Sequence, residues 1–237
     1  MNDVLEVRDL NAWYGASHVL QGISFGLAAG EVTGFLGRNG AGKTTALKAI
    51  MGLLRRRNGQ VVLDGKRIER MAPHRAARAG LGYVPEQRGI FPSLSVLENL
   101  TVAARPDRRS ADEGWSLERV FEHFPRLAER RSVGGGQLSG GEQQMLAMAR
   151  TLLGNCRVLL LDEPTEGLAP SIVADIENLL HTIKSNGTTI LLVEQNYPLA
   201  LRLADQIMIL GKGQLRWSGA ATNFERAQDV RQAWLGI

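Results

Sequence analysis

Three closely spaced glycines, followed by a lysine and two threonines, give the chain its clearest chemical signal. The stretch Gly34 to Thr45 reads GFLGRNGAGKTT and contains the spacing G-x-x-x-x-G-K-T of a phosphate-binding loop. Such a loop surrounds a polyphosphate with backbone N–H groups and with the positive end of the helix that follows it. A glycine-rich turn that only starts a helix would need neither the lysine nor the threonine. The expected nucleotide contacts are Gly37, Arg38, Asn39, Gly40, Ala41, Gly42, Lys43, Thr44 and Thr45.

Two adjacent carboxylates would supply the catalytic partners of this loop. We expect the Lys43 ammonium to lie between the β- and γ-phosphates and the Thr44 hydroxyl to ligate the Mg²⁺ that accompanies ATP. Asp162 and Glu163 follow the apolar run Val158 to Leu161, where an open α/β sheet binds its ligands. Asp162 would hold the Mg²⁺ through its water shell, and Glu163 would deprotonate the attacking water. Acidic residues often end a strand, so the pair is informative only together with the phosphate loop.

A second glycine-rich turn opens an amphipathic helix and reads Leu138, Ser139, Gly140, Gly141, Glu142, Gln143. Ser139 and Glu142 have the spacing of a capping box, so these residues could serve only to start that helix. The two glycines exceed what capping requires, because they leave N–H groups approachable and so form a second anion site. One phosphate loop and two anion-binding helix ends predict two subunits arranged head to tail, with each ATP held between the loop of one and the Ser-Gly-Gly turn of the other.

The composition is that of an ordinary soluble globular chain. Hydrophobic residues make up 44% of the 237 residues, and no window approaches about 18 uninterrupted apolar residues. The start of the chain lacks the plan of a secretory signal, and the single cysteine, Cys156, cannot form an internal disulfide, so we expect a cytoplasmic protein with Cys156 filling space beside a strand. The net charge of +4 is too small to indicate a nucleic-acid partner, and the arginine clusters at 55–57, at 105 with 108–109, and at 130–131 lie near acidic residues.

Hydrophobic periodicity predicts an α/β fold with a helical insert in its middle third. Strands are expected at Leu5 to Leu10 (broken by Asn11 to Gly15), Val19 to Leu27, Val32 to Leu36, Val61 to Asp64, Gly80 to Pro85, Arg157 to Leu161, Thr188 to Val193 and Gln206 to Leu210. Helices are expected from the phosphate loop to about Leu54, and over Leu94 to Ala104, Leu117 to Arg130, Ser139 to Leu153, Pro170 to Asn186 and the tail from Phe224. Breaks are expected at Pro106-Asp107 and at Gly134 to Gly136.

In that order, Gly37 to Thr45, Leu138 to Gln143 and Leu159 to Glu163 resemble the Walker A, signature and Walker B motifs of ATP-binding cassette (ABC) proteins, and the resemblance covers essentially the whole chain. It implies a P-loop NTPase of the ABC ATPase type, with a RecA-like, mostly parallel sheet, an antiparallel β subdomain and a helical subdomain. The chain would then be one ATP-binding domain over residues 1–237, with its α/β core at about 1–86 and 155–237 and its helical subdomain at about 87–154.

Further segments look like those of the second ATPase subunit of branched-chain amino acid importers, with the ATPase subunits of urea and short-chain amide importers as close alternatives. These segments are Tyr83 to Glu86, Phe91 to Leu100, Glu166 to Pro170 and Leu192 to Asn196. The resemblance implies an ATPase that powers import of branched-chain or other hydrophobic amino acids. Its implied partners are a second ATPase subunit, two membrane permease subunits at the cytoplasmic face of the inner membrane and, indirectly, a periplasmic solute-binding protein. No solute pocket is expected here.

The resemblance alone gives several further residues a meaning. Tyr14 stands where the family stacks an aromatic ring on adenine, with a core tyrosine at a strand end as the less favoured alternative. Either Glu86 or its neighbour Gln87 stands for the glutamine that contacts Mg²⁺ and begins the loop facing the permease. Gln195 replaces the usual γ-phosphate-sensing histidine, and Ala169 replaces the usual aspartate after Walker B. A neutral amide can hydrogen-bond the γ-phosphate but carries no positive charge, which favours a heterodimer whose other subunit retains the histidine, with a homodimer as the alternative.

Two other function classes fit less well. A small-molecule kinase also uses a phosphate loop, but it needs no Ser-Gly-Gly turn and would need an acceptor pocket. Cassettes that act on DNA or ribosomes resemble tandem fusions or carry long heptad insertions, and this chain has neither. We therefore expect an uptake motor that ATP closes and hydrolysis opens, with the segment from Glu86 to about Ala104 passing the motion to the permease.

Overall fold

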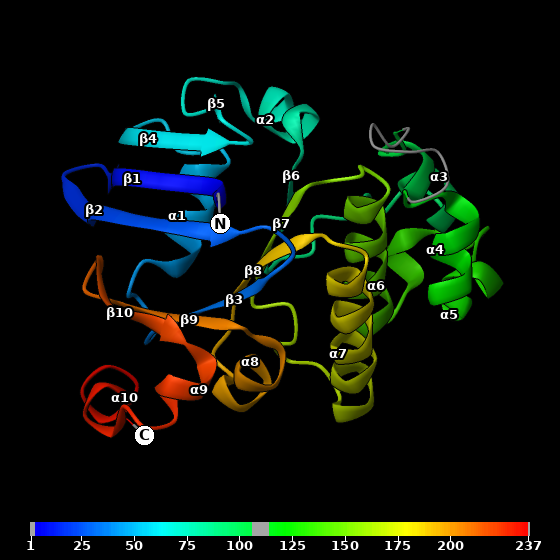
Figure 1. Ribbon diagram of the computed structural model, residues 1–237. Coiled ribbons are helices and arrows are strands. Elements are labelled where there is room, and N and C mark those ends of the chain that lie inside the picture. Colours follow the sequence, from blue (N-terminus) through cyan, green and yellow to red (C-terminus); the bar gives the residue numbers. More distant parts are fainter. Residues whose placement is uncertain (1–2, 106–113, 237) are drawn as a thin grey trace.

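The computed structural model describes residues 3–105 and 114–236, and its strands form two sheets (Figure 1). Six strands form a mostly parallel sheet in the order β10-β9-β3-β8-β7-β6, in which only β9 and β10 pair antiparallel. Their bounds are β3 (Val32–Leu36), β6 (Leu81–Val84), β7 (Val158–Asp162), β8 (Thr189–Val193), β9 (Gln206–Gly211) and β10 (Gln214–Ala220). Strands β3, β7 and β8 are buried at every residue, because helices or the second sheet cover both faces.

The second sheet is antiparallel, in the order β2-β1-β4-β5. Its strands are β1 (Asp3–Tyr14), β2 (Ser17–Ala28), β4 (Arg57–Leu63) and β5 (Lys66–Arg67). The helix α1 (Lys43–Ile50) packs between the two sheets, where Leu47 and Ile50 join Leu10 and Leu20 of the antiparallel sheet and Leu160 of β7 in one core. The helix that follows the phosphate loop is therefore fixed from both sides.

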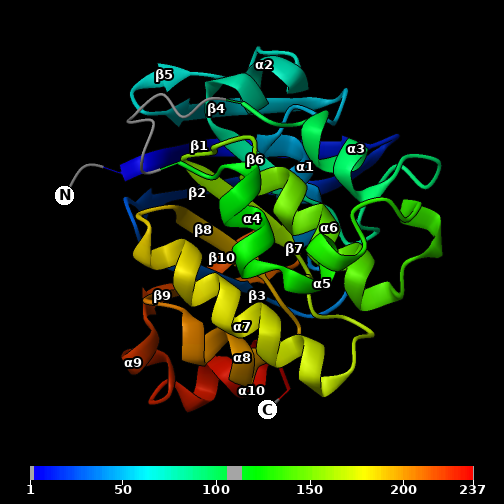
Figure 2. The same ribbon diagram turned by 90° about the vertical axis from the view of Figure 1, so that its right-hand side faces the viewer.

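The remaining helices cover the opposite face of the parallel sheet and its edges (Figure 2). Side chains alternate along β7, so Leu160 points toward α1 while Leu159 and Leu161 join the core formed with the helices. Leu146 and Leu180 come to this core from two of those helices. The helices are α2 (Pro73–Ala79), α3 (Val96–Thr101), α4 (Leu117–His123), α5 (Pro125–Glu129), α6 (Gly140–Leu152), α7 (Pro170–Ser185), α8 (Tyr197–Leu203), α9 (Ala221–Phe224) and α10 (Gln228–Trp234).

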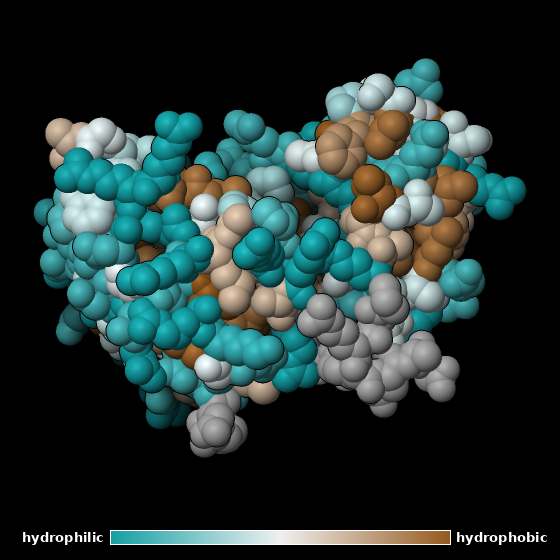
Figure 3. All heavy atoms as spheres, turned by 90° about the horizontal axis from the view of Figure 1, so that it is seen from above, coloured by the Kyte–Doolittle hydropathy of each residue, from teal (hydrophilic) through white to brown (hydrophobic). Residues whose placement is uncertain are grey.

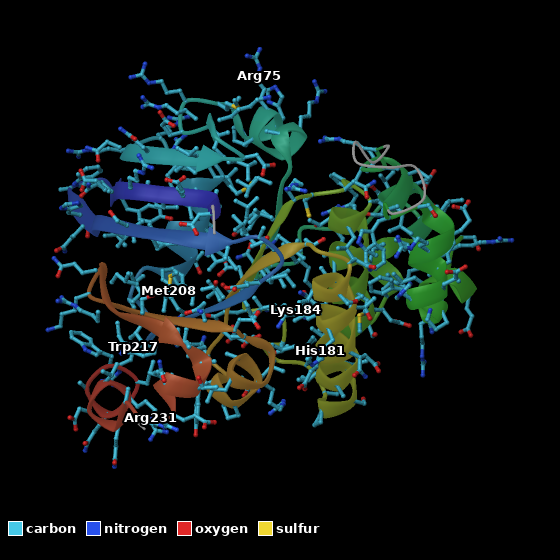
Figure 4. The ribbon with its side chains drawn as sticks, viewed as in Figure 1. Arg75, His181, Lys184, Met208, Trp217 and Arg231 are labelled. Atoms are coloured by element: carbon cyan, nitrogen blue, oxygen red, sulfur yellow. The ribbon has the colours of Figure 1, made fainter. Side chains whose placement is uncertain are left out.

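The last three helices close one corner of the parallel sheet. Phe224 of α9 is fully buried there with Leu36 and Ile209, and Trp217 of β10 packs on it with ring centroids 5.3 Å apart. Figure 4 shows Trp217 in this corner and Lys184 on α7. Lys184 pairs with Asp205 Oδ1 at 2.7 Å, and Asp205 Oδ2 accepts the Val32 N–H at 2.9 Å, so one carboxylate ties α7 to β3.

Much of the surface seen from above is polar, with apolar residues gathered toward the right-hand, helical end (Figure 3). Large exposed apolar side chains of that part of the chain include Phe91, 46% exposed, and Val102, 63% exposed. Over residues 3–105 and 114–236, no helix is both long and apolar enough to pass through a bilayer.

Several predicted boundaries were wrong. The strand expected from Val61 begins at Arg57, and the helix expected from Phe224 begins at Gln228. Three others have a clear physical cause. The first strand does not stop at Leu10, because β1 continues through register shifts to Tyr14 and pairs there with Ser17. The helix after the phosphate loop ends at Ile50 rather than near Leu54, because Gly52 adopts the positive φ that terminates helices. The expected helix from Leu117 to Arg130 is two helices, because Pro125 cannot continue α4 and instead starts α5.

Two smaller predictions were confirmed. Cys156 is buried beside β6, where a Cβ added to Gly82 would lie 2.7 Å from its Sγ atom. The prediction for the arginine clusters is confirmed at 130–131, where Arg130 pairs with Glu142 at 3.1 Å. In the cluster at 55–57, Arg56 donates to the Gly15 carbonyl at 2.9 Å. Arg108, Arg109 and the predicted break at Pro106-Asp107 lie outside the described residues.

Candidate functional site

The phosphate loop joins the end of β3 to the start of α1 at the carboxyl end of the parallel sheet. Gly37 is required by close approach, because an added Cβ would lie 2.3 Å from the Leu210 carbonyl oxygen of β9. Gly42 caps α1 at φ 109°, a left-handed conformation that favours glycine. Arg38, Asn39 and Gly40 are exposed, whereas Lys43 is only 5% exposed.

Lys43 connects the loop to the predicted base. Its ammonium donates to the Gly37 carbonyl at 2.8 Å and lies 3.5 Å from Glu163 Oε1. A buried ammonium needs such partners, because desolvation of an isolated charge is costly. A nucleotide phosphate would offer stronger acceptors at the same place.

Asp162 is the most enclosed carboxylate of the predicted metal ligands. It is 1% exposed, and its two oxygens accept hydrogen bonds from the Thr44 hydroxyl at 2.9 Å and the Tyr83 hydroxyl at 3.0 Å. Burial raises the pKa of Asp162, and the charge of Glu163 adds to this, while the two hydroxyls oppose the rise. Burial, then the Asp162 charge, also raises the pKa of Tyr83. Sequence reasoning placed Tyr83 in a segment that resembles the family but assigned its side chain no role.

Glu163 leaves β7 with its backbone at φ +50°, and its N–H donates to the Val193 carbonyl at 2.9 Å. Its Oε2 accepts from the Gln195 amide nitrogen, so the predicted base and the predicted γ-phosphate sensor are in contact. Glu166 hydrogen-bonds to Glu163 as well. That bond, together with burial and the Glu163 charge, raises the pKa of Glu166 to about 7. Sequence reasoning placed Glu166 in a segment that resembles the family but assigned its side chain no role.

Lys43, Thr44, Glu163, Glu166 and Gln195 line one cavity of about 480 Å³, the phosphate-loop cavity, whereas Asp162 and Tyr83 are not among its lining residues. It is lined by Val19, Asn39, Gly40, Gly42, Lys43, Thr44, Thr45, Glu86, Glu163, Glu166 and Gln195. Glu86 therefore faces the predicted site, whereas its neighbour Gln87 and Tyr14 are not among the lining residues; Tyr14 is 49% exposed at the end of β1. A second cavity of about 410 Å³ lies beside the loop and is lined by Gly37, Arg38, Asn39, Gln195 and Leu235, among others.

The donors present fit a nucleotide-bound Mg²⁺. A threonine hydroxyl and a carboxylate oxygen, Thr44 and Asp162, meet at one point, and oxygen donors are what Mg²⁺ prefers. Within residues 3–105 and 114–236, no cluster of three or more His, Cys, Asp or Glu side chains could hold a metal. In a nucleotide complex, Mg²⁺ keeps several waters and binds the phosphates alongside one or two carboxylates.

The second glycine-rich turn is built separately from this cavity. Ser139 caps α6 by accepting the Glu142 N–H at 3.3 Å, and its own N–H donates to Glu142 Oε2 at 2.8 Å, so the capping box forms. Leu138 is buried beneath the turn, and Gln143 donates to the Leu138 carbonyl at 3.1 Å. None of Leu138 to Gln143 lines the phosphate-loop cavity; Ser139, Gly141 and Glu142 line a different cavity of about 610 Å³.

Comparison with known proteins gives one family model and close full-length relatives. Residues 20–166 match the family described as ABC transporter. The high-affinity branched-chain amino acid transport ATP-binding protein BraG of Pseudomonas aeruginosa is 35% identical over 98% of this chain and 100% of its own length. The probable branched-chain amino acid transport ATP-binding protein LivF of Archaeoglobus fulgidus is 35% identical over 99% of both chains.

More distant similarities agree on the type of protein. The lipopolysaccharide export system ATP-binding protein LptB of Escherichia coli is 31% identical over 98% of this chain and 97% of that protein. A solved structure described as the ATP-binding subunit of an ABC transporter superimposes with a TM-score of 0.83 at 30% identity, covering 98% of this chain and 96% of the other.

Proposed function

We propose, from the premise that this chain belongs to the ABC transporter family of ATPases, that it powers import of branched-chain or other hydrophobic amino acids. The named solute of two relatives, each 35% identical over nearly the full length, supports this choice. The relative that serves lipopolysaccharide export is less similar, at 31% identity.

ATP hydrolysis takes place in the cavity between the phosphate loop and β7. The loop residues Gly37 to Thr45 bind the triphosphate, with Lys43 released from the Gly37 carbonyl to the β- and γ-phosphates. Glu163 accepts a proton from the attacking water as that oxygen bonds to the γ-phosphorus, and the bond to the β–γ bridging oxygen breaks with ADP as the leaving group. Gln195, already in contact with Glu163, donates its amide N–H to the γ-phosphate or the water.

Thr44, Asp162 and Glu86 would hold the Mg²⁺ of the nucleotide, which supplies charge neutralisation at the phosphates when bound. Hydroxyl and carboxylate oxygens that already meet at 2.9 Å support the assignment of Thr44 and Asp162. Glu86 is supported over Gln87 because it alone of the two lines the cavity. Tyr14 stacks on adenine from the exposed end of β1.

The complete site needs two ATPase subunits. The separation of the turn Leu138 to Gln143 from the phosphate-loop cavity supports a head-to-tail pair, in which that turn contacts the ATP of the other subunit. Gln195 in place of histidine favours a heterodimer. The dimer would bind two permease subunits at the cytoplasmic face of the inner membrane, with a periplasmic binding protein delivering the solute.

The permease contact lies on the helical side. The segment from Glu86 to Ala104 joins the phosphate-loop cavity at Glu86 to the exposed side chains of Phe91 and Val102. A contiguous exposed apolar patch is typical of an interaction surface, and apolar residues gather at this end of the molecule in Figure 3. We assign this role to the helical subdomain at about 87–154 of a single ATP-binding domain, with the α/β core at about 1–86 and 155–237.

The observation that carries the proposal is that Lys43, Thr44 and Glu163, from two strand ends, line one cavity, and that Asp162 is hydrogen-bonded to Thr44 beside it. The test is Mg²⁺-dependent ATP hydrolysis by the purified chain, alone and with its candidate partner ATPase. Glu163→Gln should bind ATP but lose turnover. Equal turnover by wild type and Glu163→Gln would refute the role of Glu163.

The solute is tested in cells that lack this chain. Uptake of labelled leucine should return with the wild-type chain and not with Lys43→Ala. Labelled urea and acetamide are the competing solutes. Restoration of urea or amide uptake without leucine uptake would refute amino-acid import and leave the ATPase assignment intact.

A further inference from the structure

Glu194 is a buried carboxylate, 2% exposed, between Val193 of β8 and Gln195. Each of its oxygens accepts two hydrogen bonds, and the two pairs come from different loops. Oε1 accepts from the N–H and hydroxyl of Thr165 at 3.2 and 2.7 Å. Oε2 accepts from the N–H groups of Gln195 and Asn196 at 3.2 and 3.4 Å. One side chain therefore fastens the loop after β7 to the loop after β8.

The negative charge of Glu194 is energetically unfavourable at this buried position. Burial raises the pKa of Glu194, and the hydrogen bonds from Thr165, Asn196 and Gln195 oppose that rise. A buried carboxylate is tolerated when several donors satisfy it, and two ionised oxygens accept from two sides at once. A neutral amide of the same shape could accept on one side only. Glutamate therefore suits this position, because each of its two carboxylate oxygens can accept hydrogen bonds from one of the two loops.

The two loops carry the two groups that meet at the reacting phosphate. Glu163 lies two residues before Thr165, and Gln195 directly follows Glu194. The Gln195 amide donates to the Glu163 carboxylate, so hydrogen bonds and short backbone links close a ring through Glu163, Thr165, Glu194 and Gln195. Loosening either loop from Glu194 would change the separation of Glu163 and Gln195.

We propose that Glu194 is a positioning residue for ATP hydrolysis, which holds the Gln195 amide against the Glu163 carboxylate by anchoring the loop that carries each of them. This inference rests on the proposed roles of Glu163 and Gln195. Glu194 itself does not line the phosphate-loop cavity, so it acts through its neighbours.

Glu194→Gln tests whether the Glu194 carboxylate anchors the two loops, because the substitution keeps the shape of the side chain. The new NH₂ group would face the N–H donors of one loop, which releases that loop. We expect kcat to fall about ten- to a hundredfold, the cost of misplacing a catalytic group by about 1 Å, with the Kd for ATP unchanged within about twofold. Glu177→Gln is the matched control. Glu177 of α7 binds Arg202 at 2.6 Å at the surface, and its loss should leave kcat within about twofold.

A second pair of variants tests the other end of the anchor. Thr165→Val removes the hydroxyl and should lower kcat in the same direction as Glu194→Gln, whereas Thr165→Ser keeps the hydroxyl and should recover most of that loss. Thr165→Val should lower kcat less in the Glu194→Gln variant than in the wild type, because both substitutions break the same contact. Independent effects, or equal losses with Ser and Val, would overturn the proposal.

The deciding measurement repeats Glu194→Gln in a Gln195→Ala background. If Glu194 acts by positioning Gln195, then Glu194→Gln should lower kcat by less than about threefold in the Gln195→Ala background, because the side chain that it positions is already gone. The same ten- to hundredfold loss in both backgrounds, or a parallel loss of ATP affinity, would show a general structural role and refute the inference. An inactive wild type that still binds ATP would instead refute the proposed roles of Glu163 and Gln195, so the two failures are distinguishable.

Discussion

Tyr83→Phe removes one of the two hydroxyls that stabilise Asp162 and leaves the ring in place. Asp162 is 1% exposed and accepts from Tyr83 at 3.0 Å and Thr44 at 2.9 Å. A hydrogen bond to a charged group contributes about 1.5–3 kcal/mol to the free energy of unfolding. An unfolding entropy of about 2.1 cal/mol/K per residue gives about 0.5 kcal/mol/K for a chain of this length, so Tm should fall by about 3–6 °C near neutral pH.

The loss should depend on pH with a definite sign. The pKa of folded Asp162 is raised above its unfolded value, because burial outweighs the two hydroxyl bonds. Asp162 therefore favours folding most below its unfolded pKa, and this contribution is lost as pH rises through the folded pKa. The Tyr83 hydroxyl limits that loss by stabilising the ionised carboxylate. The Tm deficit of Tyr83→Phe should be small in acid and grow as pH rises through the folded pKa of Asp162.

The assay is thermal unfolding, followed by circular dichroism without nucleotide and with EDTA, from about pH 4 to pH 8, a range that begins near the unfolded pKa of an aspartate. Tyr197→Phe is the matched control, because Tyr197 lines the neighbouring cavity rather than contacting Asp162, and its Tm should change by less than about 1 °C. A Tyr83→Phe deficit of the same size at every pH would refute the assigned contact with ionised Asp162. An unchanged Tm would show that the hydrogen bond from Tyr83 to Asp162 does not stabilise the folded protein.

Three further outcomes are expected from the cavity. Lys43→Ala should weaken ATP binding by about 2–5 kcal/mol, at least about thirtyfold by calorimetry, because a buried charge contact is lost; wild-type affinity would remove Lys43 from the site. Glu163→Gln should lower ATP turnover at least about a hundredfold and accumulate an ATP-bound dimer in size-exclusion chromatography, and a monomer with normal turnover would contradict this. Protonated Glu166 donates to Glu163 and has a pKa of about 7, so turnover should rise as pH increases through about 7. Glu166→Gln should remove that inflection from the pH profile, and an inflection that persists would exclude Glu166 as its source.

The sequence predicted the α/β fold and the elements that hold the site, because local patterns determined them. Val32 to Leu36 and Val158 to Leu161 are continuous apolar runs, and the structure buries both within the parallel sheet. The glycine spacing before Lys43 required the loop that joins β3 to α1. The meeting of Thr44 with Asp162 was also predictable, since Asp162 ends one strand of the parallel sheet and Thr44 follows another, so both lie at the same edge.

What the sequence did not predict depends on contacts between segments distant in the chain. Nothing near Tyr83 indicates that its hydroxyl reaches Asp162, because that contact requires β6 to lie beside β7 in a particular register. The bond between Glu194 and Thr165 likewise spans 29 residues. Strand β10 was missed because its residues alternate weakly and only its pairing with β9 fixes them as a strand.

The position of α10 offers an optical readout that needs no added label. Trp234 packs on Gly211, with the Arg216 guanidinium 4.7 Å above its ring, and the next residue, Leu235, lines the cavity that Arg38 and Asn39 share. Indole emission responds to nearby charge and to solvent. A change in the phosphate loop would therefore alter the fluorescence of Trp234, and replacing the other tryptophans with phenylalanine would isolate that signal for stopped-flow measurement of nucleotide arrival.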